Sequence, residues 1–322
     1  MKILTLEEIR SALPSVNLMD EIEKGFVAYS RGESVVPPVG ELILQDPPGE
    51  VHIKYGYING DDAYVIKIAS GFFDNFKIGL PTSNGMMLMF SQKTGQLIAA
   101  LLDEGYLTDI RTAIAGAIAA KYLAPKKVGR IGIVGTGVQA RLQLEYLAPV
   151  VDCREVLVWG RSQDKLNQFV IDMTEQGFDV EATMDATAVE QSCNLIVTTT
   201  PATSPILTGQ LQPGTHVTAV GSDTPDKQEV AASILQQADL VVADSIKQCL
   251  ERGEIHQALK SSAIERSALV ELGGIISGDA KGRTSNDQVT IADLTGVAVQ
   301  DIQISKAVFE SITEKGSDPI FD

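Results

Sequence analysis

The sequence predicts an α/β protein in which a doubly wound parallel sheet is joined to a second, α+β domain. Strand and helix signals alternate from about Lys126 onward, and short strands joined by turn residues fill the region before it. A chain of 322 residues is long enough for two domains, each with its own core. We expect residues 1–120, completed by 297–322, to form one domain and residues 121–296 the parallel sheet.

The composition narrows the class of protein. Hydrophobic residues make up 44% of the chain and charged residues 21%, which is typical of a globular protein. A net charge of −16 would repel nucleic acid and anionic membranes, so we expect neither as a partner. The three cysteines show no CxxC spacing, which disfavours a disulfide framework or a metal site. With no signal peptide and no run of eighteen apolar residues, a cytoplasmic protein is expected.

The first domain is predicted to begin with two helices and continue as an antiparallel sheet. Thr5 opens a capping box, and Ile22 and Phe26 share one face of a second helix over residues 18–29. Alternating or apolar stretches separated by turns then predict strands. These strands cover residues 51–57, 63–69, 86–90 and 96–102. Thr108 is expected to cap an alanine-rich helix that ends before Pro125.

The second domain is predicted to hold parallel strands at residues 130–134, 155–159, 195–199, 216–220 and 240–243. Most gaps between them are long enough for a helix, as a doubly wound sheet requires. The segments 288–294 and 301–314 are ambiguous. They could close the parallel sheet and then return to the first domain.

A glycine-rich loop after the first of these strands predicts a Rossmann-type dinucleotide site. The loop follows an apolar strand and opens a helix. Its first glycine permits a tight turn, its second lets backbone amides approach a pyrophosphate, and its alanine allows close packing. The expected cofactor contacts are Gly135, Thr136, Gly137, Val138, Gln139 and Ala140, with Thr199 at a neighbouring strand end. A glycine-rich turn without a ligand is the alternative.

The end of the second strand favours NADPH, with NADH also accepted. NAD-specific sites place an acidic residue there, but here Arg161 and Ser162 follow Gly160. Both side chains suit a 2′-phosphate. Alternatively, Arg161 stacks on the adenine or is solvated.

Three charged residues are candidates for a substrate site. Lys67 lies in an apolar strand, where an ammonium is costly without an anion, unless it reaches water at a sheet edge. Arg111 is expected in the first turn of the helix after Thr108, where free amides and a cation would bind a carboxylate. The alternative is that Asp103, Glu104 or Asp109 neutralises it. Asp223 follows a parallel strand, at the edge where such sheets bind ligands, and is a candidate proton donor or a plain turn residue.

In the order of these segments the sequence resembles the ornithine cyclodeaminase/mu-crystallin family over nearly its whole length. The matching stretches are the strand with Lys67, residues 79–82, residues 107–113, the Gly135 loop and residues 221–229. The resemblance implies a homodimer that acts on a small-molecule substrate. It also implies that Lys67 and Arg111 hold the substrate carboxylate, that Asp223 acts in proton chemistry, and that Thr82 and Lys227 lie near the nicotinamide and substrate.

Members of the family include cyclodeaminases, cyclic ketimine reductases and alanine dehydrogenases. Lys54 stands where ornithine cyclodeaminases carry a glutamate, and Glu41 is the sole charge where they carry an arginine. An added lysine would repel the distal ammonium of a diamine. We therefore expect an NADPH- or NADH-dependent ketimine reductase that converts Δ1-pyrroline-2-carboxylate to L-proline, with Lys67 and Asp223 catalytic and Lys54 near the substrate. An ornithine cyclodeaminase, an alanine-dehydrogenase-like enzyme and a non-catalytic binding protein are the alternatives.

Overall fold

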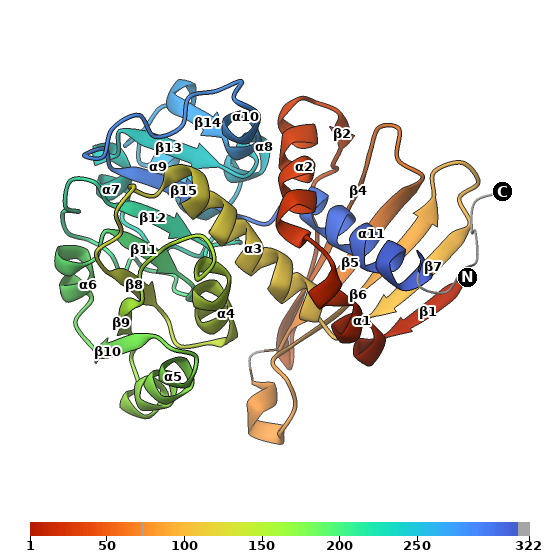
Figure 1. Ribbon diagram of the computed structural model, residues 1–322, viewed down its shortest axis with the longest axis horizontal. Coiled ribbons are helices and arrows are strands. Elements are labelled where there is room, and N and C mark those ends of the chain that lie inside the picture. The colour runs from red at the N-terminus through yellow and green to blue at the C-terminus, as the bar shows by residue number, and fades with distance from the viewer. Residues whose placement is uncertain (73, 315–322) are drawn as a thin grey trace. The chain divides into compact units, whose positions relative to one another are not determined.

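The computed structural model describes residues 1–72 and 74–314, and its contacts divide the chain into two compact units (Figure 1). The first unit comprises residues 1–111 together with the segment that starts at Val297, and the second unit comprises residues 112–296. The division falls inside helix α3 (Tyr106–Leu123), whereas the predicted domain boundary at residue 120 lies near the end of that helix.

The first unit contains a seven-stranded sheet in the order β1-β7-β6-β5-β4-β2, with β3 also paired to β4. The strands are β1 (Lys2–Thr5), β2 (Ser34–Val35), β3 (Gly40–Gln45), β4 (Pro48–Ile58), β5 (Ala63–Gly71), β6 (Ser83–Ser91) and β7 (Leu97–Leu102). The predicted strands are present and pair antiparallel, while β1 pairs parallel with β7. Sequence reasoning missed β3, because Pro47 and Pro48 were read as a break, whereas they lie at the turn of the hairpin that β3 forms with β4.

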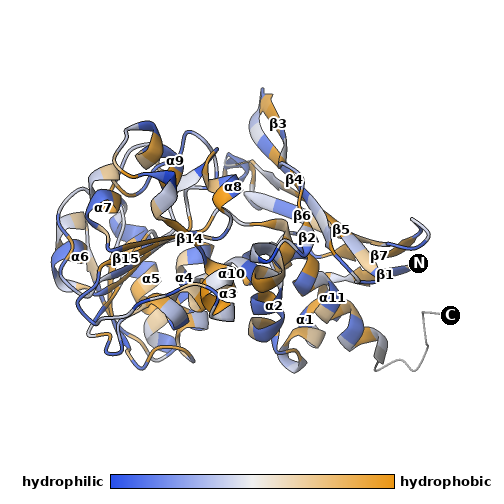
Figure 2. Cartoon of the chain, turned by 90° about the horizontal axis from the view of Figure 1, so that it is seen from above, coloured by the Kyte–Doolittle hydropathy of each residue, from blue (hydrophilic) through white to orange (hydrophobic). Residues whose placement is uncertain are grey.

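Helices α1 (Leu6–Ala12), α2 (Leu18–Ser30) and α11 (Ala298–Glu314) lie on one side of β4 to β7, as Figure 2 shows. Two short 3-10 helices, η1 (Leu13–Ser15) and η2 (Asn75–Ile78), complete the unit. The capping box at Thr5 is formed as predicted, with Thr5 and Glu8 each accepting a bond from the other's backbone amide. The ambiguous C-terminal segment therefore supplies a helix of the first unit.

Apolar residues of β4 and β5 lie on both faces of the sheet, and two lysines lie among those that face the helices. Lys54 lies in register opposite Lys67, and both are buried on the face that carries the helices. Successive strand residues face opposite sides, so Tyr55 and Ile66, which are also in register, lie on the open face. Lys54 and Lys67 are covered, although they are charged, because they belong to a charged cluster described below.

The second unit contains an eight-stranded, all-parallel sheet in the order β10-β9-β8-β11-β12-β15-β13-β14. Its strands are β8 (Ile131–Val134), β9 (Glu155–Trp159), β10 (Asp179–Thr183), β11 (Leu195–Thr198), β12 (His216–Ala219), β13 (Leu240–Ala243), β14 (Leu269–Glu271) and β15 (Thr290–Asp293). The predicted doubly wound sheet is confirmed. The ambiguous segment 288–294 supplies β15, which inserts between β12 and β13.

Helices cover both faces of this sheet, with α3, α4 and α10 on one side and α8 and α9 on the other in Figure 2. The helices after α3 are α4 (Val138–Leu147), α5 (Gln163–Glu175), α6 (Ala186–Ser192), α7 (Ala232–Gln237), α8 (Ile246–Cys249), α9 (Gly253–Lys260) and α10 (Leu272–Ser277), with the 3-10 turn η3 (Arg266–Ala268). In the described part of the chain, no helix is both long and apolar enough to cross a membrane.

The order of strands reverses between β8 and β11. From β8 the chain builds outward through β9 to β10, and from β11 it builds in the other direction through β12. In such sheets, ligands bind at this switch point, outside the carboxyl ends of the strands. The glycine-rich loop follows β8 directly, so the fold places it at the expected edge of the sheet.

Candidate functional site

The first glycine of the loop after β8 is required by the protein's own geometry. Gly135 has a φ of +125°, which side-chain-bearing residues rarely adopt. A Cβ atom there would lie 2.5 Å from Oγ1 of Thr199, the residue that follows β11. Thr199 in turn donates its backbone amide and its hydroxyl to the carbonyl of Val134. The loop and the end of β11 are therefore packed directly against each other.

The second glycine is not required by the protein. Gly137, the N-cap of α4, has extended backbone angles (φ −84°, ψ −168°) that any residue tolerates. A Cβ there would meet no atom within 4 Å. Neither its backbone angles nor its neighbours require a glycine at this exposed helix N-terminus. A missing side chain here fits the close approach of a pyrophosphate. The residues of this loop therefore fit a dinucleotide.

The loop is also held by a residue that sequence reasoning missed. Arg141 of α4 donates from Nη1 to the carbonyl oxygens of Thr136 (2.6 Å) and Gly137 (3.2 Å). Its Nε and Nη2 bond to Asp172 of α5, and its guanidinium lies over the Phe169 ring. Arg141 fixes the carbonyls of the loop, which leaves the amides at the start of α4 facing outward. The remaining loop residues are Val138, exposed, Gln139, half-buried, and Ala140, fully buried.

At the end of β9, the structure modifies one sequence expectation. Arg161 is exposed, as a residue that reads a coenzyme phosphate would be. Ser162, however, is the N-cap of α5, and its Oγ accepts from the amide of Lys165 at 3.5 Å. Its hydroxyl is therefore engaged as an acceptor within the helix cap, although it can still donate a bond to a phosphate.

After β12, two predicted residues are brought together. Lys227 Nζ lies 2.8 Å from Asp223 Oδ1, and the backbone carbonyl of Lys227 accepts from the hydroxyl of buried Ser222. Arg252, just before α9, donates to the backbone carbonyl of Asp223 at 3.4 Å. The Asp223 side chain keeps 35% of its surface exposed, so it is accessible to a ligand at the carboxyl edge of the sheet.

In the first unit, Lys67 and Arg111 share one buried carboxylate, that of Asp301 in α11. Lys67 Nζ lies 3.6 Å from Asp301 Oδ2, and Arg111 Nε lies 3.0 Å from Asp301 Oδ1. Arg111 also donates from Nη1 to Gln300 at 3.1 Å. All three charged side chains are at most 4% exposed, and Lys54 is 5% exposed. Lys67 is therefore part of a buried charged cluster and does not reach water at a sheet edge.

Sequence reasoning overlooked Asp301. The sequence offers one hint of its role. The amide Gln300 and the acid Asp301 lie in a helix whose other early residues are apolar and buried. Such charges are costly unless paired, so they point to partners elsewhere in the fold. Thr82 lies exposed just before β6, where its carbonyl accepts from the amide of Phe72.

The predicted start of α3 was wrong. The helix begins at Tyr106, and Asp103 caps it by accepting from the amide of Leu107 at 2.8 Å. Thr108 therefore lies inside the helix, and Arg111 falls in its second turn, where the amides are already bonded along the helix. The idea of a carboxylate held by free helix amides beside Arg111 is thus not supported. The cation itself remains, neutralised by Asp301.

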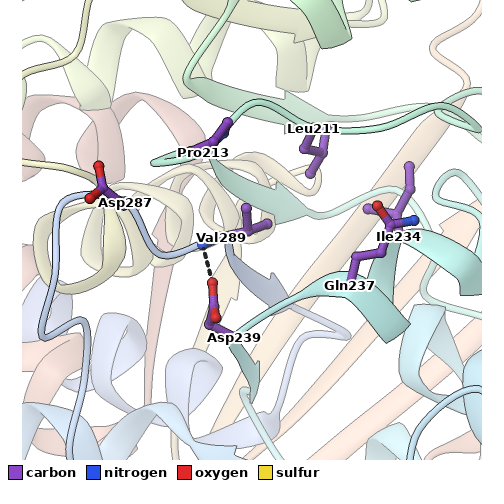
Figure 3. Close-up of a pocket in the computed structure, with 7 residues that line it drawn as sticks. All are labelled: Leu211, Pro213, Ile234, Gln237, Asp239, Asp287 and Val289. Carbon is purple, nitrogen blue, oxygen red and sulfur yellow. Dashed lines mark hydrogen bonds between the residues drawn. The ribbon is translucent and has the colours of Figure 1, made fainter.

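A small cavity of about 240 Å³ in the second unit lies away from these residues (Figure 3). It is lined by residues that precede β12, β13 and β15, among them Pro213, Asp239 and Val289, and Asp239 accepts from the amide of Val289 at 2.8 Å. The cavity is therefore at the amino edge of the sheet, opposite to the edge that binds ligands in this fold.

Comparison with known protein families matches residues 1–316 to the ornithine cyclodeaminase/mu-crystallin family. The chain belongs to this family. An uncharacterized cyclodeaminase of Sinorhizobium fredii is 43% identical over 100% of this chain and 99% of its own length. A Δ1-pyrroline-2-carboxylate reductase of Bacillus cereus is 32% identical, over 98% of each chain.

Solved structures with the same fold hold nicotinamide dinucleotides. An archaeal alanine dehydrogenase dimer with bound NAD superposes with a TM-score of 0.88 at 31% identity, covering 100% of this chain and 99% of its own. A Δ1-pyrroline-2-carboxylate reductase of Thermococcus litoralis, in complex with NADH and L-proline, has a TM-score of 0.88 at 27% identity and 98% coverage of both chains. The expected resemblance to the family is confirmed, and the substrate is left open among its activities.

For this family member, replacing Gly137 with valine should abolish dinucleotide binding without unfolding the chain. The valine backbone is tolerated, but its side chain would occupy the approach to the α4 amides. The measurement is a fluorescence titration with NADH, alongside circular dichroism. Gly129→Val is the matched control, because Gly129 is also exposed and a Cβ there would meet only Asn194 Oδ1 at 3.9 Å. Tight binding by the Gly137 variant would show that this loop does not hold the pyrophosphate.

Proposed function

We propose that the chain is an NADPH- or NADH-dependent reductase of cyclic ketimine 2-carboxylates, which converts Δ1-pyrroline-2-carboxylate to L-proline. The observation that carries the proposal is the burial of three cations, Lys54, Lys67 and Arg111, in the first unit, with Lys67 in register with Lys54 and beside Arg111 at Asp301. A group of buried cations attracts anions strongly, because charges interact over a low dielectric constant in the protein interior. A substrate carboxylate is an anion of this kind.

The same cluster disfavours a diamine substrate. Lys54 is buried on the helix-covered face of the sheet, in register with Lys67. An ammonium at the far end of ornithine would be repelled by this second lysine at low dielectric. A cyclic ketimine carboxylate has no distal ammonium, so it fits the charge better. The Δ1-pyrroline-2-carboxylate reductases among the relatives support this choice.

In the proposed mechanism, Lys67 and Arg111 hold the carboxylate and orient the carbon of the C=N bond. The reduced nicotinamide, when bound, supplies the hydride. Asp223 hydrogen-bonds the ring nitrogen, directly or through water, and keeps the proton of the iminium in place. Lys227, 2.8 Å from Asp223, orients that carboxylate. Asp301 orients Lys67 and Arg111 through its two oxygens.

Substitutions of the carboxylate-binding residues and of the proton-handling Asp223 should affect different kinetic constants. Lys67→Met and Arg111→Met remove contacts made in both the ground and transition states, so KM for pyrroline-2-carboxylate should rise strongly. Asp223→Asn keeps the shape but removes the charge that stabilises the iminium, so kcat should fall on the order of 10²–10⁴-fold. The measurement is steady-state oxidation of NADH or NADPH.

Matched controls lie on the same elements or nearby. Asp226→Asn changes an exposed acid of the same loop, and Lys93→Met an exposed lysine of the first unit; both should leave the kinetics unchanged. Wild-type turnover by Asp223→Asn would disprove the proton role. A wild-type enzyme that ignores cyclic ketimines but releases ammonia from ornithine, or that aminates pyruvate, would replace the reductase with a cyclodeaminase or an alanine dehydrogenase. Activity with none of these would favour a binding protein.

Coenzyme choice can be tested at Arg161. Arg161→Ala should weaken NADPH more than NADH, by ~1–3 kcal/mol, if the exposed guanidinium makes a charge-assisted bond to the 2′-phosphate. Dissociation constants for both coenzymes give the comparison, with Arg266→Ala, another exposed arginine of the second unit, as control. Equal losses for NADH and NADPH would mean that Arg161 does not read the phosphate.

A homodimer through the open face of the first-unit sheet is part of the proposal. Tyr55 and Ile66 lie in register on that face, and the rings of Tyr64 and Phe90 stack there at 5.0 Å. An apolar sheet face without helices is a typical protein interface, and a second copy of the chain is the proposed occupant. The dimeric archaeal alanine dehydrogenase of the same fold supports this.

Tyr55→Asp should therefore convert the dimer to a monomer, because a carboxylate would be buried at the interface without a partner. Tyr55 is 38% exposed in the single chain. Light scattering measures the mass, and Ile171→Asp, at a 52% exposed position of α5, is the control that should stay dimeric. An unchanged mass for Tyr55→Asp would place the interface elsewhere.

A further inference from the structure

A fully buried glutamate, Glu229, ties together the ends of two neighbouring strands of the second unit. Its Oε2 accepts from the hydroxyl of Thr198 at 2.7 Å, at the end of β11, and from the amide of Gly221 at 2.8 Å, just after β12. Its Oε1 accepts from the amide of Thr200. One carboxylate therefore satisfies three donors from two adjacent loops.

These two loops pack in close backbone contact at the switch point of the sheet. A Cβ on Gly221 would lie 2.2 Å from the carbonyl oxygen of Thr200. On its other side, Thr199 touches Gly135 of the dinucleotide loop. The segment 198–200 thus lies between the Gly135 loop and the end of β12, where a dinucleotide that enters over α4 would place its nicotinamide half.

A second buried acid, Glu254, bonds the backbone of Glu229. A third buried acid, Asp293, bonds the backbone of the helix that carries Glu254. Glu254 of α9 accepts from the amides of Glu229 (2.7 Å) and Val230 (3.2 Å). Asp293, at the end of β15, accepts from the amide of Ile255 at 2.8 Å. The three carboxylates are all fully buried. Each accepts a bond from a backbone amide of the next element, so they form a chain of contacts from β15 through α9 to the end of β11. Such a series leaves Glu229 little freedom to move.

The charge state of Glu229 responds to pH near neutrality. Burial raises the pKa of its carboxyl from 4.5 to about 7, against the lowering effect of the bonds from Thr198, Thr200 and Gly221. Around it, β11 and the end of β12 supply hydroxyl and amide donors. The elements α9 and β15 supply two further acids, Glu254 and Asp293. Burial also raises the pKa values of these two acids.

We propose that Glu229 is a positioning residue for the coenzyme: its carboxylate fixes the 198–200 segment and Gly221 against the Gly135 loop, and coenzyme affinity depends on that charge. This inference rests on the proposed use of NADH or NADPH. Glu229 is buried beneath the loops and acts through their backbone. It adds no group to the chemical step.

The test compares Glu229→Gln with Glu190→Gln. The amide of a glutamine would point an N–H at a backbone or hydroxyl donor, so one loop contact is lost. We expect the Kd for NADH to rise about 10-fold or more. Glu190 of α6 is 2% exposed and also accepts from two backbone amides, those of Thr208 and Gly209, but it lies at the amino edge of the sheet. Its variant should lose stability yet bind NADH normally.

The pH profile separates positioning from plain stability. Because the folded pKa of Glu229 lies above 4.5, protonation favours the folded chain, and the stability that this proton contributes is lost as pH rises through about 7. Coenzyme affinity should change in the opposite direction and improve as the carboxylate forms. Wild-type NADH Kd should therefore fall between pH 6 and pH 8, and the Glu229→Gln profile should be flatter.

Three results would overturn the inference. These are wild-type NADH affinity in Glu229→Gln, an equal loss in Glu190→Gln, or an unchanged pH slope in the Glu229 variant. None of these measurements needs a substrate. A failure of the ketimine assay with NADH binding intact would count against the proposed substrate alone, whereas a wild-type chain that binds neither coenzyme would overturn both proposals.

Discussion

A charge removed from water must meet donors or an opposite charge, and both units of this chain are organised by that requirement. In the first unit, Lys67 and Arg111 are buried against Asp301, which fixes where α11 lies on the sheet. In the second unit, Glu229 and Glu254 are buried against backbone amides, which fixes how the loops at the carboxyl edge are arranged. Polar side chains hold the functional edges in place, while apolar residues fill the rest.

This constraint explains why two lysines are tolerated within the covered face of the first-unit sheet. A sheet with helices on one face normally directs its apolar residues toward them. Here Val65, Met87 and Met89 follow that rule, but Lys54 and Lys67 share the covered face with them. Tyr55 and Ile66 face away. The covered face combines this charged cluster with a buried apolar core, and the open face carries further apolar side chains. A second copy on that side would bury it, so under the proposed dimer both faces of the sheet are covered.

The sequence predicted much of the fold because local signals and tertiary packing agree there. The capping box at Thr5, the α2 face with Ile22 and Phe26, and the apolar parallel strands were all visible in short windows. The start of α3 was misplaced because Thr108 and Asp103 are both good caps, and the choice depends on contacts before the helix. β15 was ambiguous because it inserts between strands that precede it in the chain.

The candidate site was predicted in part for a related reason. Gly135, Gly137 and Lys67 stand out because each breaks a local rule of composition or patterning. Asp301 and Glu229 do not stand out, because a carboxylate within a helix or a loop is ordinary until its burial is known. Their roles depend on partners far away in the chain, Arg111 for one and Thr198 with Gly221 for the other. Only the fold reveals such pairings.

The buried charged cluster around Asp301 and the buried acids around Glu229 belong to different units. This separation bears on how substrate preference can differ within the family. Every residue proposed to hold the substrate carboxylate belongs to the first unit. The residues proposed to hold the coenzyme, and the proton-handling Asp223, belong to the second. A change such as glutamate to lysine at position 54 alters the charge beside Lys67 through strand register alone. It leaves the bonds of Glu229, Arg141 and the Gly135 loop untouched, because none of them involves a residue of β4 or β5. Under the proposed function, substrate preference can therefore change within the first-unit sheet while the coenzyme chemistry is retained.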